Sequence, residues 1–187
     1  MFNNTIVKIP SESYVNGLTT SDLGRPNLEL ALEQHQAYIE ALKKCGTTVT
    51  VLPSNIEFPD STFVEDTAVL TPNFAVISNP GALSRNGEIH EMEPVLKSFY
   101  ESIYKIKAPG TLDGGDILQI EDHFYIGISA RTNHDGGLQL KTILELEGYK
   151  GTIVELEKFF HLKTGITYLG NHTIVVAGEF IDHPEFN

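Results

Sequence analysis

The chain has 187 residues, of which 41% are hydrophobic and 20% charged, enough for one soluble domain with its own core. Its formal net charge of −12 argues against nucleic acid or an anionic membrane as a partner, and we expect neither a signal peptide nor a membrane span. The single cysteine, Cys45, excludes an internal disulfide and suits a cytoplasmic location.

Strand and helix patterns alternate along the first half of the chain. We predict a strand at 5–9, a helix from Pro26 to Cys45 with Pro26 in its first turn, and a strand at 48–52. A hairpin at 67–78, a helix at 90–101 and a strand from 102 follow. The first helix should bury one apolar face, formed by Leu28, Leu32, Tyr38, Leu42 and Cys45.

The same order of elements returns in the second half. A hairpin is predicted at 116–128, and a helix follows with Asp135 as its N-cap and Gly148 at its end. A strand from 151 and a third hairpin at 166–177 complete the series. Equivalent hairpin positions recur fifty residues apart, at Val76, Ile126 and Val176. A fixed period of this size predicts a repeat architecture of ββαβ units.

The repeat predicts one α/β domain, 1–187, with units at about 1–55, 60–108, 112–157 and 162–187. The first and last units are incomplete. A ring of units, closed by a C-terminal strand that pairs into the first unit, would explain why the first unit has only one strand before its helix. We therefore expect a chain cut short at its C-terminus, with the last module missing.

Acidic side chains gather in the stretch FPDSTFVEDTAVL, which contains Asp60, Glu65 and Asp66 and no basic residue. Crowded carboxylates repel each other, so a cation should compensate them. That cation is either a ligand or a basic side chain such as Arg85 or Arg131, in which case the group is a salt-bridge cluster.

Two further stretches each allow a functional and a structural interpretation. LDGGDIL, with Asp113 and Asp116, is either a turn with solvated acids or a place of close backbone approach. His161 in FFHLKTG is either a hydrogen-bonded core residue or a catalyst. Arg131 in SARTN is either a surface charge or an anion clamp, and Arg85 alone looks like a loop charge.

Together, FVEDTAV, LDGGDIL, SARTN and HLKTG, in this order and spacing, resemble the dimethylarginine dimethylaminohydrolase family of the amidinotransferase, or guanidine-modifying, superfamily. The resemblance runs along the whole chain. It implies a pentein fold, a five-bladed α/β propeller of ββαβ modules, here incomplete. It also implies hydrolysis of N-ω-methylated arginine to citrulline and methylamine or dimethylamine.

The resemblance also implies a role for each of the singled-out residues. Glu65 and Asp66 match positions that bind the guanidinium, Asp60 one that holds the α-amino group, and Leu18 one in a loop that closes over the substrate. Arg85 and Arg131 match the pair that grips the α-carboxylate. His161 matches the general acid and base, Asp113 matches an acid that orients it or contacts the guanidinium, and Asp116 is expected to support this region structurally.

The family's nucleophile is a cysteine close to the C-terminus, which attacks the guanidinium carbon to give a thiouronium intermediate. This sequence ends before that position. We expect Cys45 to be a small buried hydrophobe rather than a substitute, and the chain as it stands to be inactive.

Alternative interpretations are an arginine deiminase-like enzyme, a non-catalytic binder of arginine analogues, or a gene remnant. No cofactor and no metal site are expected, since the histidines lack metal-ligand spacing. The expected partners are a small-molecule substrate and, through an open strand edge, a second copy of the chain.

Overall fold

A computed structural model describes residues 3–186 of the chain. It divides into two compact units, Met1–Val64 and Glu65–Asn187, and each is described by itself. Among the described residues, no helix is both long enough and apolar enough to cross a membrane.

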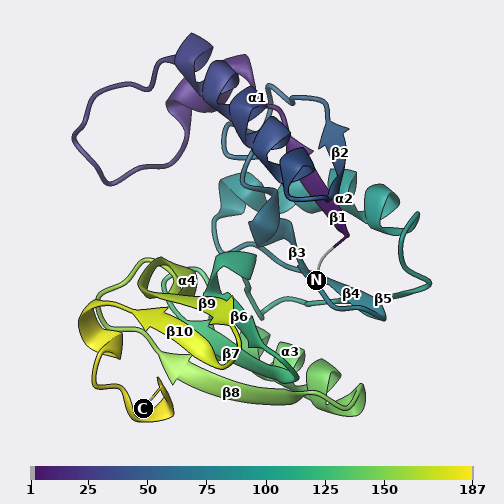
Figure 1. Ribbon diagram of the computed structural model, residues 1–187, viewed down its shortest axis with the longest axis vertical. Coiled ribbons are helices and arrows are strands. Elements are labelled where there is room, and N and C mark those ends of the chain that lie inside the picture. The colour runs from purple at the N-terminus through teal and green to yellow at the C-terminus, as the bar shows by residue number, and fades with distance from the viewer. Residues whose placement is uncertain (1–2, 187) are drawn as a thin grey trace. The chain divides into compact units, whose positions relative to one another are not determined.

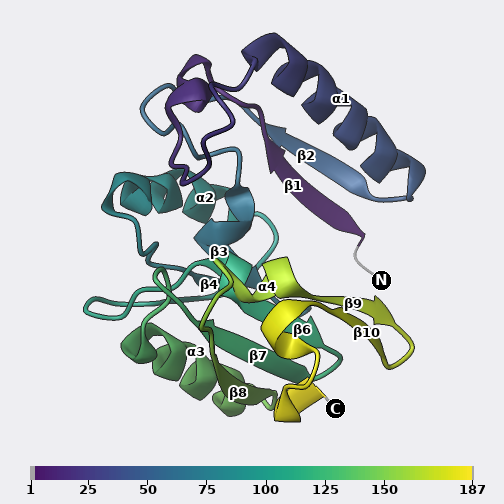
Figure 2. The ribbon, with the colours of Figure 1, turned by 90° about the vertical axis from the view of Figure 1, so that its left-hand side faces the viewer.

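The first unit is a strand–helix–strand arrangement. Strand β1 (Asn4–Lys8) pairs in parallel with β2 (Thr48–Leu52), and α1 (Leu28–Lys44) connects them and lies along the pair (Figures 1 and 2). A short 3₁₀ helix, η1 (Glu12–Asn16), follows β1. The α1 helix begins at Asn27, whose side chain accepts the Leu30 N–H. Pro26 therefore precedes the helix, and its predicted place in the first turn was wrong.

The buried face of α1 differs from the predicted one. Ile39 is the one buried residue of the helix, and the half-buried stripe beside it is formed by Leu28, Ala31, His35 and Leu42. Because these positions follow the helical spacing of three to four residues, Leu32 and Tyr38 fall outside the stripe and are exposed. Cys45 caps the C-terminus of α1 and is also exposed, so its predicted burial was wrong.

The second unit contains three hairpins, and the first two each carry a parallel third strand. The sheets are β3 (Ala68–Leu70), β4 (Phe74–Ile77) and β5 (Ser102–Lys105); β6 (Ile117–Ile120), β7 (His123–Ile128) and β8 (Lys150–Glu155); and β9 (Ile166–Gly170) with β10 (Thr173–Val176). The hairpins pair antiparallel, and β5 and β8 join in parallel. All three predicted hairpins and both closing strands are confirmed.

The repeat is slightly less regular than fifty residues throughout. The first residue of each hairpin pairs with Ile77, Ile126 and Val176, respectively. Val76, which was taken as the equivalent position in the first hairpin, instead pairs with Val69. Val76 and Ile126 nevertheless face the same apolar cluster together with their partners Val69 and Ile117, so packing supports the predicted fifty-residue match although the strand starts differ by one residue.

The two helices between hairpin and closing strand differ in length. Helix α2 (Ile89–Leu96) follows a 3₁₀ segment, η3 (Leu83–Glu88), contains Pro94 and ends five residues before the predicted end. Helix α3 (His134–Leu146) lies against the β6–β8 sheet (Figure 1).

The cap of α3 is Asn133, whose side chain accepts the Gly136 N–H. Asp135 therefore lies in the first turn and is not the predicted cap, because Asn133 precedes the first residue with helical geometry. Gly148 follows the helix with a φ of +85°, a conformation that favours glycine, so its predicted role as terminator is confirmed.

Two apolar clusters surround the turns that enter the hairpins. The larger joins the first two sheets and α3 through residues such as Val76, Leu112, Phe124, Ile126 and Leu140. The smaller, around Leu162, Ile166 and Phe180, packs the third hairpin against β6 and β8. Leu112 and Leu162, which precede β6 and β9, are buried in these clusters. The segments that carry the site residues are therefore held in place.

Candidate functional site

The candidate site residues of the second unit occur at equivalent places in its repeats. Acidic side chains or a histidine lie just before the first strand of each hairpin, on η2 (Val64–Thr67), on η4 (Gly114–Asp116) and at the N-cap of α4 (Leu162–Gly165). An arginine follows the second strand of the first two hairpins, Arg85 after β4 and Arg131 after β7. The repeat therefore places charged side chains at the same end of each sheet.

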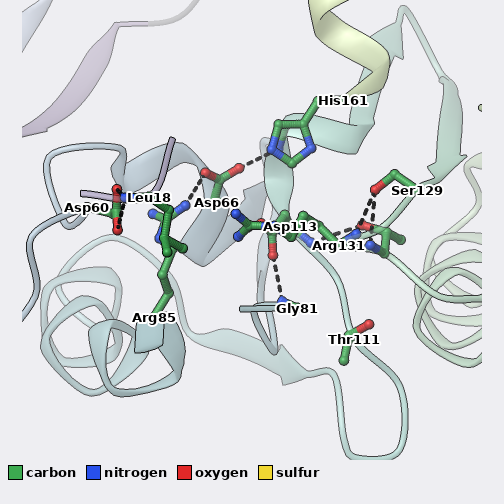
Figure 3. Close-up of polar contacts among 12 residues, drawn as sticks. Leu18, Asp60, Asp66, Gly81, Arg85, Thr111, Asp113, Ser129, Arg131 and His161 are labelled. Atoms are coloured by element: carbon green, nitrogen blue, oxygen red, sulfur yellow. Dashed lines mark hydrogen bonds and ion pairs between the residues drawn. The ribbon is translucent and has the colours of Figure 1, made fainter. Parts of the chain in front are cut away.

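Three of these groups converge. One side-chain atom each of Asp66, Asp113 and His161 lies within 4.8 Å of the other two. All three residues are buried, and Figure 3 shows their side chains pointing toward a common point. We name this set the acidic triad; it unites three of the residues singled out in the sequence.

Asp66 is held from two sides. Its Oδ2 atom accepts a hydrogen bond of 2.6 Å from Arg85 Nη1, and its Oδ1 atom accepts the Gly115 N–H at 2.8 Å. The Arg85 guanidinium also donates to both oxygens of Glu88. Although burial disfavours the charged guanidinium, the hydrogen bonds and charges of Glu88 and Asp66 outweigh it and raise the pKa of Arg85. Arg85, which alone looked like a loop charge and which the resemblance assigned to the α-carboxylate, is thus buried and forms ion pairs with Asp66 and Glu88.

Asp113 has one satisfied oxygen and one open oxygen. Its Oδ1 accepts the Gly81 N–H at 2.8 Å, whereas Oδ2 is buried and has no hydrogen-bond partner among the described residues, 3.6 Å from Arg131 Nη1. Burial is the main cause that raises the pKa of Asp113; the Gly81 N–H and the two arginines act in the opposite direction. The Arg131 guanidinium also lies over the Phe160 ring, 5.1 Å from its centre.

His161 is paired with Asp116 and not with Asp113. Its Nδ1 lies 3.1 Å from Asp116 Oδ1, an ion-pair distance at which the ring N–H is not aligned for a regular hydrogen bond. Burial disfavours the charged ring, but the contact with Asp116 and the charges of Asp116, Asp66 and Asp113 outweigh it and raise the pKa of His161. The sequence predicted only a structural role for Asp116. Its position fifty residues after Asp66, one period of the repeat, was the signal that could have marked it as a residue of the site.

Glycines allow these close approaches. A Cβ atom on Gly114 would lie 2.0 Å from the Glu65 carbonyl oxygen, and one on Gly115 would lie 2.8 Å from the His161 ring. A Cβ atom on Gly81 would lie 2.2 Å from the Arg131 carbonyl oxygen. Of the two interpretations of LDGGDIL, the structure therefore shows close backbone approach, with both aspartates buried.

The remaining predicted residues lie outside the triad. Glu65 is exposed and pairs with Lys163 Nζ at 2.6 Å. In the first unit, the Leu18 N–H donates to both oxygens of Asp60, at 3.0 and 3.2 Å, while the Leu18 side chain stays half exposed. This contact fixes the start of the loop after η1 to the buried Asp60 carboxylate.

The charges of the second unit suit an organic cation with a planar fork of N–H donors. The triad atoms are close enough to share one cation, yet Arg85 already neutralises part of Asp66, and Arg131 lies near Asp113. A doubly charged metal ion would be repelled by both arginines about twice as strongly as a singly charged guanidinium at the same place. A guanidinium could instead donate to the open Oδ2 of Asp113 and to remaining lone pairs of Asp66.

Comparison with known proteins finds a matching family profile and two relatives that carry the same name. The profile of the eukaryotic N,N-dimethylarginine dimethylhydrolase family matches residues 19–185. The N(G),N(G)-dimethylarginine dimethylaminohydrolase of Pseudomonas aeruginosa is 49% identical over 187 residues, which cover the whole chain and 74% of that protein. The protein of the same name from Streptomyces coelicolor is 40% identical over 172 residues, 91% of the chain and 66% of the relative.

Solved structures agree in fold. The P. aeruginosa enzyme, as a cysteine-to-serine mutant complexed with citrulline, matches with a TM-score of 0.98 over 100% of this chain and 73% of that one. The N-terminal domain of ArgZ, 17% identical, matches with a TM-score of 0.83 over 92% of this chain and 65% of its own, a likeness of fold alone. With the repeated hairpin units, these matches confirm the pentein-type α/β fold. The chain belongs to the N,N-dimethylarginine dimethylhydrolase family.

Proposed function

We propose that this chain carries the substrate-binding groups and the acid/base of a hydrolase that converts N-ω-methylated arginine to citrulline and methylamine or dimethylamine. The observation that carries the proposal is the open Oδ2 of Asp113, buried within the triad and 3.6 Å from Arg131. A buried carboxylate oxygen without a hydrogen-bond donor is costly, and a substrate N–H would satisfy it. Family membership supplies the reaction class.

The proposed roles follow the charges. Asp66 and Asp113 bind the guanidinium, and Glu65 contributes a further acceptor by exchanging its Lys163 partner for the substrate. Arg131, and with it Arg85, binds the α-carboxylate. The burial of Arg85 between Asp66 and Glu88 makes Arg131 the more available of the two. For Leu18 and Asp60 the assigned contacts, closure over the substrate and binding of the α-amino group, rest on the family resemblance alone.

The chemistry needs two proton transfers at His161. A thiolate adds to the guanidinium carbon, the C–N bond to the methylated nitrogen breaks, and the imidazolium gives its proton to the departing amine. Water then attacks the thiouronium carbon, the neutral imidazole accepts its proton, and the C–S bond breaks to release citrulline. Burial opposes the charged ring, but the three neighbouring carboxylates outweigh it and raise the pKa of His161, which favours the proton-donating form that the first step needs.

We propose further that the thiolate is not supplied by residues 1–187. The sequence has one cysteine, and Cys45 lies exposed at the C-terminus of α1, in the first unit. On this proposal the 187-residue chain binds ligands without turnover. Loss of a nucleophile from a set that acts as a unit costs roughly 10⁴–10⁶ in rate.

A paired assay tests the function. The 187-residue chain should release no citrulline from dimethylarginine above background, while calorimetry should detect binding of citrulline or arginine. A chain extended by the C-terminal segment of the P. aeruginosa relative should release citrulline and dimethylamine, and a His161→Ala variant of it should not. Citrulline formation by the short chain, lost in Cys45→Ser, would make Cys45 the nucleophile and overturn the assignment.

The alternatives predict different products. An arginine deiminase-like enzyme would release ammonia from unmethylated arginine at a higher rate than amine from dimethylarginine. A non-catalytic binder would remain inactive even in the extended chain. The extended protein therefore separates all three functions in one experiment.

We also propose that the chain acts in the cytoplasm and associates with a second copy through its third hairpin. The lone, exposed Cys45 suits a reducing compartment. Leu169 and Val175, on β9 and β10, are 63% and 52% exposed and would be covered in such a contact. Light scattering should find a dimer that Leu169→Glu dissociates; an unchanged monomer in both would refute the contact.

A further inference from the structure

The connection between β8 and α4 leads directly to His161, the proposed acid/base. The ladder of β8 ends at Glu155, and His161 is the N-cap of α4. Residues 157–160 therefore lie beyond the sheet, and Phe160 among them lies beneath Arg131. The place of the histidine depends on what holds this connection.

Glu179 holds the connection by its backbone. The Oε2 atom of Glu179 accepts the N–H groups of Glu157 and Lys158, both at 3.1 Å, and its Oε1 atom accepts those of Lys158 and Phe159, both at 3.2 Å. Successive backbone N–H groups that point at one place form a nest, which suits an anion. The Glu179 carboxylate is the anion that fills this nest, and we name the contact the carboxylate clamp.

The clamp favours the ionised form of Glu179. Burial alone would raise its pKa, but the N–H groups of the nest outweigh burial, the charge of Lys158 acts in the same direction, and the pKa of Glu179 is lowered. Hydrogen bonds to an ionised carboxylate are stronger than those to a neutral acid. The clamp is therefore closed at neutral pH.

The residue next to Glu179 holds the same connection through a side chain. Phe180, the last residue of η5 (Gly178–Phe180), is fully buried, and its ring stacks on that of Phe159 with centres 5.4 Å apart. Gly165 and Gly178 leave room for the Phe159 ring, because a Cβ atom on either would lie within 2.9 Å of it. One short 3₁₀ helix thus holds the connection at a polar and an apolar point.

We propose that Glu179 is a positioning residue of the hydrolase: by filling the nest at 157–159, it fixes the connection that places the His161 ring within the acidic triad. Glu179 touches neither the triad nor the arginines in this role, and it acts through the backbone. The catalytic meaning of the inference rests on the proposed function, whereas the clamp is a property of the folded 187-residue chain.

The first test empties the nest and refills it. In ¹⁵N-labelled Glu179→Ala, the amides of 157–159 should exchange hydrogen faster than in the wild type. Acetate, which supplies the same carboxylate, should shift their signals and slow the exchange again at constant ionic strength. Glu185→Ala, which removes an exposed carboxylate from the same C-terminal segment, is the matched control.

Acetate that binds elsewhere, for example at Arg131, would shift signals in the wild type and in both variants alike. The comparison therefore isolates the nest. Equal exchange and an equal acetate response of the 157–159 amides in all three proteins would overturn the clamp.

The second test asks whether the clamp positions the histidine. Burial opposes the charged ring, but the neighbouring carboxylates raise the pKa of His161, so a ring that moves away from them should titrate closer to about 6.5. An NMR titration should show this fall in Glu179→Ala, its recovery with acetate, and no change in Glu185→Ala. An unchanged pKa of His161 in Glu179→Ala would refute the positioning role.

A milder variant covers the case in which Glu179→Ala does not fold. Glu179→Gln keeps the length of the side chain and one acceptor oxygen but turns the other acceptor into a donor that faces the nest. Its 157–159 amides should exchange faster than those of the wild type, and the pKa of His161 should fall. Wild-type values of both quantities in Glu179→Gln would count against the proposal.

Turnover gives a separable readout in the extended, cysteine-containing protein. Displacement of a reacting group by about 1 Å can cost on the order of 10²-fold in rate, so Glu179→Ala should lower kcat by about 10- to 100-fold and leave KM within about fivefold. Acetate should restore part of kcat. A rise of KM with unchanged kcat would contradict the proposal. If the extended wild-type protein is itself inactive, the proposed function fails, while the measurements on the 187-residue chain still decide the clamp.

Discussion

The first two hairpins of the second unit are each followed by an arginine, Arg85 on η3 after β4 and Arg131 in the turn after β7, and the two are held differently. Arg85 is 4% exposed and forms ion pairs with Asp66 and Glu88. Within residues 3–186, Arg131 has one carboxylate neighbour, Asp113, at 3.6 Å, and it lies over the Phe160 ring. Arg85 thus anchors two buried acids, whereas Arg131 is the arginine that the proposed function assigns to the ligand.

The largest effect is expected for Arg85→Met, which leaves Asp66 and Glu88 buried without their cation. Breaking a buried ion pair from one side costs about 3–5 kcal/mol. Urea unfolding should therefore show a lower free energy of unfolding for this variant, with a much smaller loss in Arg131→Met. Equal losses in the two variants would remove the distinction between the arginines.

Although Arg131→Met should cost little stability, it should weaken ligand binding strongly. A charge-assisted hydrogen bond contributes roughly 1.5–3 kcal/mol, so Arg131→Met should weaken citrulline binding by about 10- to 150-fold. Calorimetry on the 187-residue chain measures this, with Lys107→Met, an exposed lysine, as the charge control. Unchanged affinity would mean that Arg131 serves only to neutralise Asp113.

The pH dependence of stability should sharpen the same contrast. The folded-state pKa of Asp113 lies above its unfolded value of about 3.9. The folded state thus binds the proton more tightly, and the contribution to the free energy of unfolding falls as pH rises from that value through the folded pKa. His161, also raised, contributes fully below about 6.5 and loses its contribution as pH rises through its own folded pKa.

Urea unfolding at several pH values, from about 4 to 9, separates the two groups. Asp113→Asn should flatten the acidic part of the profile. Arg131→Met should extend that part to higher pH, because the guanidinium charge lowers the pKa of Asp113. A profile that is identical in all three proteins would place the titration elsewhere.

The smallest effect is expected for Phe160→Leu, which removes the ring beneath Arg131. An exposed cation–π contact contributes about 0.5–1 kcal/mol. Stability should fall by no more than that, and citrulline affinity should change less than in Arg131→Met. A loss of affinity as large as that of Arg131→Met would show that Phe160, and not the charge alone, positions the guanidinium.

The repeat, the hairpins and the family could be predicted from sequence because they depend on local alternation and on motif spacing. The caps Asn27 and Asn133 were missed because several polar residues near each helix start could serve, and only backbone geometry selects one. The exposure of Cys45 was missed because a stripe drawn through Leu32 and Tyr38 follows the wrong face of α1.

For the site, the sequence indicated which residues take part but not which side chains contact one another. Asp66, Asp113 and His161 converge, as the family resemblance implied, whereas Glu65 is exposed and pairs with Lys163. The choice of Asp116 over Asp113 as the contact of His161 depends on how the turn at Gly114–Asp116 directs each side chain, which spacing alone does not determine. The burial of Arg85 depends on Glu88, one helical turn away, a residue that carried no functional signal in the sequence.

Gly81 has a consequence for motion. Its N–H binds Asp113, and its Cα faces the backbone of Arg131 too closely for any side chain. The turn that leads toward Arg85 and the turn that holds Arg131 therefore touch backbone to backbone. Neither turn can move outward without displacing the other, so we expect the two arginine turns to move together, and a ligand that orders one of them to order both.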